Sequence, residues 1–180
     1  MFTRETIVET LAKQREAFVA RYRSFTPEEL TQLCTQSEAS DGTPWQAKDH
    51  IAHLTMIERA FQRMVERTIA GSEDPVGFGR FGGFEGGNRE EIVAWVHRNN
   101  QVYVDAHRDD DLETLLTRFT ATRAGTLALL EHLTDEQLAA PLPGAPWADG
   151  SIGGVLITNA HHEMMHLNWV EEGLTKGLSH

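Results

Sequence analysis

Residues 151–173 read SIGGVLITNAHHEMMHLNWVEEG, and this stretch decides the fold. It predicts a long helix that begins after Ser151 and ends near Gly173, since glycine is a common C-terminal cap. Helical steps place five side chains in one line: Val155, Asn159, His162, His166 and Trp169. This face is neither a plain apolar stripe nor an open, solvated surface. It indicates a helix that packs in a bundle and carries polar groups inside it.

The two histidines of this face lie four residues apart, so their side chains share one side of the helix about one turn apart. Two imidazoles along a bundle-facing stripe are costly to bury unless something occupies their nitrogens. A metal ion does so. The same residues, His162 to His166, match the H-E-x-x-H pattern of zinc proteases.

The rest of the chain shows the helical period throughout. Apolar residues at three- and four-residue steps predict helices at about 4–24, 45–69, 88–107 and 112–133. Capping boxes predict short helices after Thr26 and Thr134. Seven glycines in residues 71–87 predict a long mobile loop. With no alternating pattern to suggest strands, we expect one all-α domain, 1–180. Its expected form is an up-and-down four-helix bundle of mostly antiparallel neighbours, with one extra helix and short connecting helices.

His53 is the candidate for a third metal ligand. It lies in line with Ile57, Ala60 and Phe61, in the middle of the inward stripe of the helix at 45–69. A single histidine there is usually a core residue that bonds to a carbonyl group. Three inward histidines with one pair at ligand spacing favour a metal site instead. The remaining histidines lie on other faces or near helix ends, where solvated or structural roles suffice.

Two carboxylates are candidate catalytic residues. Asp49, one turn before His53, either contacts the imidazole or the open side of the metal, or meets the positive end of the helix dipole. Glu163 follows His162 and lies about 100° round the helix from it. It either flanks the site as a general base or lies beside the bundle.

The protease interpretation requires a third zinc ligand downstream of the two histidines, and the sequence does not supply it. In the extended H-E-x-x-H-x-x-G-x-x-H pattern, Trp169 replaces the glycine and Glu172 replaces the last histidine. No predicted strand is available to bind an extended peptide. If a metal binds, its third ligand therefore comes from upstream, and His53 is the best candidate.

The combination Trp45-x-x-x-Asp49-x-x-x-His53-Leu54 with His162-x-x-x-His166 resembles the DinB/YfiT-like superfamily of bacterial four-helix-bundle metalloproteins. The resemblance covers essentially the whole chain. It implies a DinB-like bundle whose metal ligands are His53, His162 and His166. It also implies a divalent metal, most often zinc or nickel, with iron or manganese as further options, and a homodimer. Some members of that superfamily are hydrolases, and others use thiols such as bacillithiol or mycothiol as co-substrates.

Net charge and cysteine content limit the binding partners and the compartment that the sequence predicts. The net charge of −11 argues against binding to nucleic acid or to an anionic membrane surface. A single cysteine, Cys34, excludes an intrachain disulfide and favours a reducing compartment, so we expect a cytoplasmic protein. The sequence therefore predicts a metal-dependent enzyme that activates water or a thiol and acts on a small molecule. The alternative is a non-catalytic helical dimer that binds a metal or ligand in a stress response.

Overall fold

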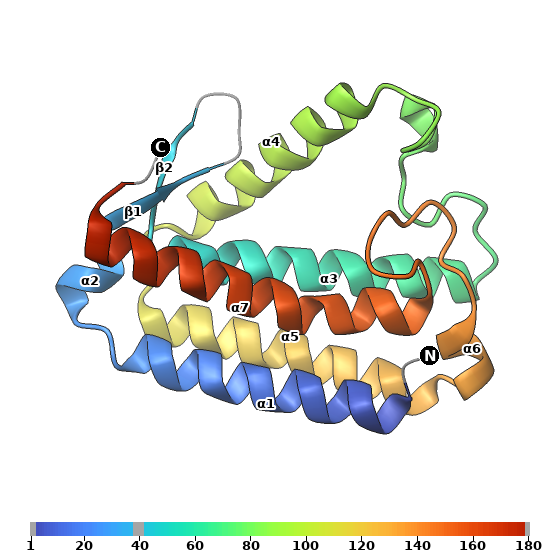
Figure 1. The fold of residues 1–180 in the computed structure, drawn as a ribbon, viewed down its shortest axis with the longest axis horizontal. Helices are drawn as coiled ribbons and strands as arrows, with labels where there is room; N and C mark the ends of the chain where they lie inside the picture. Colours follow the sequence, from blue (N-terminus) through green and yellow to red (C-terminus); the bar gives the residue numbers. More distant parts are fainter. Residues whose placement is uncertain (1–2, 38–41, 179–180) are drawn as a thin grey trace.

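Five long helices dominate the computed structural model, which describes residues 3–37 and 42–178. These are α1 (Arg4–Arg23), α3 (Asp49–Ile69), α4 (Arg89–His107), α5 (Leu112–His132) and α7 (Ile152–Lys176). The short elements are α2 (Pro27–Thr31), β1 (Leu33–Gln36), β2 (Pro44–Gln46), the 3-10 helix η1 (Gly79–Phe81) and α6 (Asp135–Ala139). The predicted all-α bundle is confirmed, with α4 as the extra helix and α2 and α6 as short connections (Figure 1).

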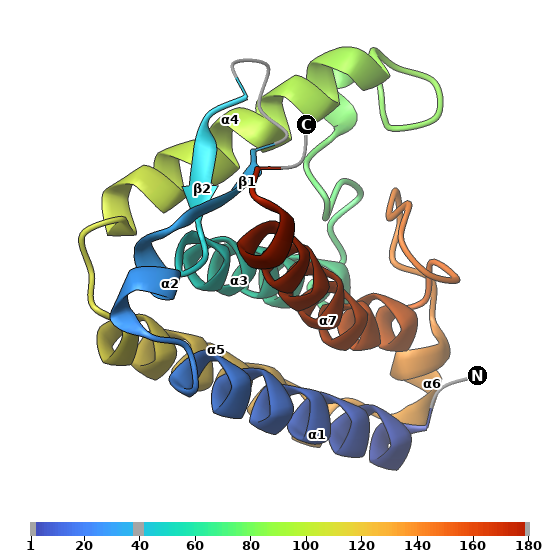
Figure 2. The same ribbon diagram turned by 60° about the vertical axis from the view of Figure 1, so that its left-hand side comes forward.

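The bundle consists of α1, α3, α5 and α7, and each of these helices packs against two of the others. Figure 2 shows α1 and α5 in one layer and α3 and α7 in the next, with α4 outside α3. Each helix buries one stripe of apolar residues, as the sequence period predicts. None of the described helices is long and apolar enough to cross a bilayer.

Helix direction differs from the expected pattern of mostly antiparallel neighbours. Consecutive long helices alternate in direction along the chain. One of them, α4, lies outside the bundle between α3 and α5 in the sequence. As a result α5 runs parallel to α3, and α7 runs parallel to α1. The neighbour pairs α3–α7 and α1–α5 are antiparallel, and Arg4 at the start of α1 reaches the carbonyl of Leu133 beyond the end of α5.

Local capping fixes most helix starts. Four side chains accept a hydrogen bond from the backbone N–H three residues further on: Thr3, Asn88, Asp111 and Ser151. Thr26 and Thr134 form the two predicted capping boxes, which begin α2 and α6. These ends therefore follow from short-range sequence signals alone.

The region before α3 contradicts two predictions. Residues expected to be irregular form a small antiparallel hairpin, in which β1 pairs with β2. Trp45, expected to begin a helix, lies in β2, and α3 begins at Asp49. Strands of four and three residues are too short to show an alternating pattern, and Pro44 is a residue that normally argues against a strand. The indole N–H of Trp45 donates to Gln101 Oε1 at 3.0 Å and so attaches the hairpin to α4.

The hairpin also packs on α7, and Gly173 makes this contact possible. A Cβ atom at position 173 would lie 1.9 Å from the carbonyl oxygen of Cys34 in β1. Only a residue without a side chain allows the two backbones to approach so closely. Gly173 was expected to end the helix, but α7 continues to Lys176 and Gly173 serves the packing of the hairpin.

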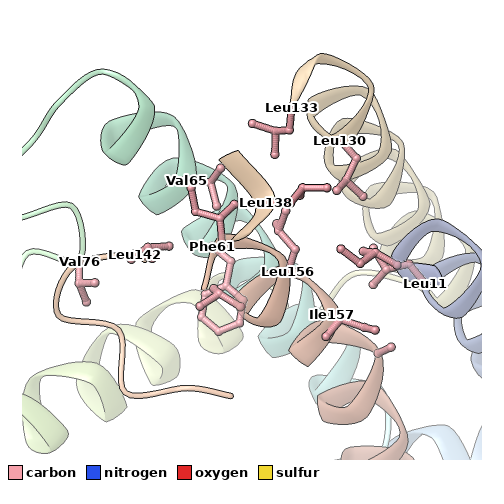
Figure 3. Close-up of a cluster of buried hydrophobic side chains, with 14 of the residues drawn as sticks. Leu11, Phe61, Val65, Val76, Leu130, Leu133, Leu138, Leu142, Leu156 and Ile157 are labelled. Atoms are coloured by element: carbon pink, nitrogen blue, oxygen red, sulfur yellow. The ribbon is translucent and has the colours of Figure 1, made fainter. Parts of the chain in front are cut away.

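The apolar core consists of two clusters at opposite ends of the bundle. Figure 3 shows the cluster nearer α6, where Leu11, Leu130 and Leu156 meet between helices. The loop at 71–87 is confirmed as a loop and contributes Val76 and Phe78 to this cluster, 5% and 4% exposed. The cluster nearer the hairpin contains stacked Phe18 and Tyr22, with ring centroids 4.5 Å apart.

Candidate metal centre

The three predicted ligands meet between α3 and α7. Candidate ligand atoms of His53, His162 and His166 all lie within 4.8 Å of one another. His53 and His166 are buried, 6% and 4% exposed, and His162 is half-buried. The antiparallel packing of α3 on α7 brings these residues together from positions more than a hundred residues apart in the sequence.

The arrangement of nitrogen atoms suits a divalent ion. His162 Nε2 and His166 Nε2 face each other at 2.9 Å. His53 makes no hydrogen bond within residues 3–37 and 42–178, and its Nδ1 is a buried polar atom without a partner. Buried polar atoms almost always have partners. Three converging imidazoles are a common ligand set for zinc and related metals.

The protonation states also suit a metal. Burial lowers the pKa of His162 to about 4. Burial, followed by the neighbouring imidazoles, lowers the pKa values of His53 and His166 well below the usual value. All three imidazoles are therefore neutral at neutral pH, which is the form that donates a lone pair to a metal.

His50 contacts the ligand His166 from the side opposite His162. His50 Nδ1 lies 2.8 Å from His166 Nδ1, and His50 Nε2 lies 2.8 Å from Thr35 Oγ1. If His166 Nε2 binds the ion, its Nδ1 carries the proton and donates to His50 Nδ1. His50 then carries its own proton on Nε2 and donates it to the Thr35 hydroxyl. The hairpin residue Thr35 can take part in either arrangement, because a hydroxyl group both donates and accepts, and it connects the hairpin through His50 to a ligand on α7.

Sequence reasoning assigned His50 only a solvated or structural role, and the structure places it at 1% exposure beside the site. Burial and then His162 lower its pKa to about 3, so it is neutral. A signal for this position exists in the sequence. His50 precedes His53 by three residues, and residues three apart in a helix share a face.

Asp49 lies at the start of α3 and is 1% exposed. Its Oδ2 accepts the backbone N–H of Gln46 at 2.9 Å and pairs with Arg108 Nη2 at 3.2 Å. Neither partner is a histidine. Of the two roles considered from the sequence, these contacts favour the one at the helix start, where the carboxylate joins α3 to the end of α4.

Glu163 points away from the three histidines into a buried group of four charges. Its carboxylate accepts from Arg15 at 2.7 Å and also pairs with Arg123. Both arginines bind Glu58 on α3 as well, at 2.5 Å and 2.6 Å. Burial raises the pKa of Glu163 although the arginines oppose this shift. A general base in a zinc protease must reach the metal site, so these contacts do not support the H-E-x-x-H interpretation.

Cys34 lies in β1 outside the histidine cluster. Its side chain is fully buried, and burial raises the pKa of the thiol to about 12. The nucleophilic thiolate is therefore absent at neutral pH. Its position against α7 fits a packing role.

The histidines line a cavity of about 230 Å³. Its other walls include Trp147, from the loop before α7, and Met165 and Trp169 from α7 itself. The Trp169 ring lies 4.8 Å from the His166 ring. The site is therefore reachable by a small molecule, in contrast to a structural metal site enclosed by four protein ligands.

The sequence comparison agrees with this geometry. Residues 37–170 match the family model of the DinB superfamily. The chain belongs to the DinB superfamily. The DinB match begins before β2 and ends within α7, so it includes all three histidines. No curated protein and no solved structure matches the chain significantly.

Proposed function

We propose that this DinB protein is a metal-dependent enzyme that acts on a small molecule, as a hydrolase or as a thiol-dependent transferase. The proposal is based on one observation: three neutral histidines converge at a cavity, and one of them has no hydrogen-bond partner in the described residues. A divalent ion held there would supply a Lewis acid that makes a neighbouring water or thiol more acidic. Zinc and nickel are the leading candidates, with iron or manganese as further options.

The surrounding residues support such a site in distinct ways. His53, His162 and His166 would hold the ion, and His50 orients His166 through its Nδ1. Trp147 and Trp169 supply aromatic walls of the cavity. The contacts of Asp49 and Glu163 favour supporting roles for both carboxylates, since each is already engaged with arginine.

Metal analysis of untagged protein tests the site. We expect about one divalent ion per chain, and loss of the ion in His53→Ala and His166→Ala. His161→Ala is the matched control, because His161 is an exposed neighbour on α7 outside the cluster. Stoichiometric metal in both ligand variants would rule out this assignment.

The rival proposal is a non-catalytic helical dimer that binds a metal or ligand during stress. The open cavity favours catalysis, because a binding module would be expected to fill the coordination sphere with protein ligands. A screen of thiol consumption separates the two. Bacillithiol, mycothiol and glutathione are each incubated with electrophiles, with and without added metal. Metal-dependent turnover that His53→Ala abolishes supports the enzyme. No turnover in any combination, together with a coordination sphere filled by protein ligands, supports the rival.

A further inference from the structure

A second and larger cavity lies beside the metal centre. It measures about 500 Å³ and is bounded by α3, by α4, by Val76 and Phe78 of the loop and by Trp147. Figures 1 and 2 show α4 diverging from α3 towards this loop. Most of the lining side chains are apolar. The volume is in the range of cavities that take up small organic ligands, about 300–1,000 Å³.

The two cavities adjoin one another. They share four wall residues: Ile57, Phe61, Val96 and Trp147. These four side chains therefore form a common wall, and a ligand in the large cavity lies on the other side of it from the histidine cluster. The large cavity is well placed to hold the body of a molecule whose reactive group lies at the metal centre.

Two polar residues of the large cavity lie near one level. α4 runs antiparallel to α3, and Arg59 Nη1 contacts the Tyr103 hydroxyl at 3.4 Å. Arg63 lies about 6 Å beyond this contact along α3, and Asn100 lies about 4.5 Å beyond it along α4, in the same direction. Both residues line the cavity.

Asn100 and Arg63 both lack protein partners. Asn100 is only 7% exposed as a residue, and no hydrogen bond of its amide is found within the described residues. Its amide atoms are not among the buried polar atoms that lack a partner, so the accessible part of the amide faces the cavity that Asn100 lines. Arg63 and Arg67, one turn apart, are exposed and form no ion pair in the described part of a chain with net charge −11. An unpaired guanidinium and a buried amide together suit a carboxylate.

The separation of Arg63 from His53 gives an approximate length for the ligand. Arg63 follows His53 by ten residues, which corresponds to a rise of about 15 Å along the axis of α3. Because an extended chain is a zigzag, each carbon–carbon bond of about 1.5 Å advances it by about 1.25 Å, and about twelve carbons span this distance. We propose that the large cavity binds an amphipathic carboxylate, with the carboxylate at Arg63 and Asn100 and the reactive group about twelve atoms away at the metal centre. The role of the metal in this inference rests on the proposed function.

Binding of dodecanoate tests the cavity directly. Trp95 and Trp147 line it, so tryptophan fluorescence reports occupancy. Titrations use dodecanoate, dodecanol and dodecyltrimethylammonium, all below their micelle concentrations. We expect dodecanoate to bind about tenfold more tightly than dodecanol, the usual effect of one hydrogen bond to a charged group. Decanoate should bind about fifteenfold more weakly than dodecanoate, because it lacks two methylene groups. The cationic ligand should bind no better than the alcohol.

Variants locate the carboxylate. Arg63→Ala and Asn100→Ala should each weaken dodecanoate binding about tenfold and leave dodecanol binding unchanged. Arg98→Ala is the matched control, because Arg98 is an exposed arginine of α4 outside the cavity. Thermal unfolding of each variant checks that it folds. Equal affinity for dodecanoate and dodecanol, or equal effects of Arg63→Ala and Arg98→Ala, would overturn the inference.

Titration of the wild-type protein before and after removal of metal by a chelator separates this inference from the proposed function. Arg63 and Asn100 hold the carboxylate, so the roughly tenfold preference for dodecanoate over dodecanol should persist in both states. Dodecanoate binding by wild-type protein in which metal analysis finds no ion would refute the proposed function and leave the ligand class standing. A metal-loaded protein that does not bind dodecanoate would refute the ligand class alone.

Discussion

His50 shows how one residue outside the histidine triad can affect it. It is the only described side chain that hydrogen-bonds to Nδ1 of His166, and it connects that ligand to Thr35 of the hairpin. Histidines that bind a metal usually hydrogen-bond to such a partner through their other ring nitrogen. Loss of the partner typically lowers metal affinity by roughly 10- to 100-fold. The hairpin therefore has a role at the site, although it contributes no ligand.

Substitution of His50 should weaken metal binding without removing a ligand. We expect His50→Leu to lower zinc affinity about 10- to 100-fold, because the Nδ1–H of His166 loses its acceptor. His50→Asn should restore part of the affinity, since its amide oxygen can take the place of Nδ1. Competition with a chelator measures both variants, and His132→Leu, at an exposed histidine of α5, serves as the control. Wild-type affinity in His50→Leu would contradict this role.

Among the elements, the helices were predictable and the hairpin was not. Periodicity and caps act over a few residues, so α1, α4, α5 and α7 could be placed from sequence. The hairpin depends on contacts with α7 and α4 that are distant in sequence. For the same reason Trp45 was misplaced, because its partner Gln101 lies on another helix.

A buried group of four charges was also missed: Glu163 was considered only as a general base or as a residue beside the bundle, and the other three charges were overlooked. Arg15 lies between Leu11 and Phe18 in the buried stripe of α1. Glu58, Arg123 and Glu163 occupy the corresponding interior positions of α3, α5 and α7. Each of the four buried stripes thus contains one charged residue, and the four charges are two positive and two negative. Such a pattern in the sequence indicates a buried ion-pair group without net charge, and here this group lies between the two apolar clusters.

Removal of one member of this group should destabilise the bundle. We expect Glu58→Gln to lower the free energy of unfolding by about 3–5 kcal/mol at pH 7, because two buried guanidinium groups lose a carboxylate. Glu66→Gln, at an exposed glutamate of the same helix, should change it by less than about 0.5 kcal/mol. Urea unfolding measures both variants. Equal stability of the two would show that the ion pairs contribute little.

This effect should depend on pH in a defined direction. Burial alone would raise the pKa of Glu58, but Arg123 and Arg15 outweigh it, and the pKa lies below the usual value. The stabilisation is therefore present above the unfolded-state pKa of about 4.5 and is lost as the pH falls through the lower folded-state value. The difference between wild type and Glu58→Gln should shrink below about pH 4.5. A difference that grows in acid would contradict this direction.

The approach of α7 to β1 gives a further prediction at the scale of elements. Alanine normally stabilises a helix relative to glycine by about 1 kcal/mol. Gly173→Ala should instead lower the free energy of unfolding by about 1–3 kcal/mol, because the new Cβ meets the Cys34 carbonyl. The matched control is Gly125→Ala in α5, where the Cβ would lie 3.3 Å from the Gln62 amide, a side chain that hydrogen-bonds to Thr122 and Thr126. Thermal unfolding should show a clearly larger loss of stability for Gly173→Ala than for Gly125→Ala, and a stabilised Gly173→Ala would contradict the close contact.

At the scale of the whole molecule, the three candidate metal ligands could be predicted from the sequence. The contacts of the residues around them could not. His53, His162 and His166 lie on the buried faces of their helices, so the sequence predicts that all three imidazoles point inward. A bundle packs the buried faces of its helices against one another, and this brings the three imidazoles together. The partners of Asp49 and Glu163 belong to other helices, so their contacts could not be read from their own helix. The adjoining apolar cavity likewise depends on how far α4 diverges from α3.

The distance in sequence between α3 and α7 also determines when the three histidines can meet during protein synthesis. At about 5–20 residues per second, the ribosome adds His162 roughly 5–20 s after His53. The parallel pair α1 and α7 cannot form before then either, so the nascent chain has neither its histidine cluster nor two of the bundle's interfaces. An ion that requires all three imidazoles can therefore enter this site only after α7 has been synthesised.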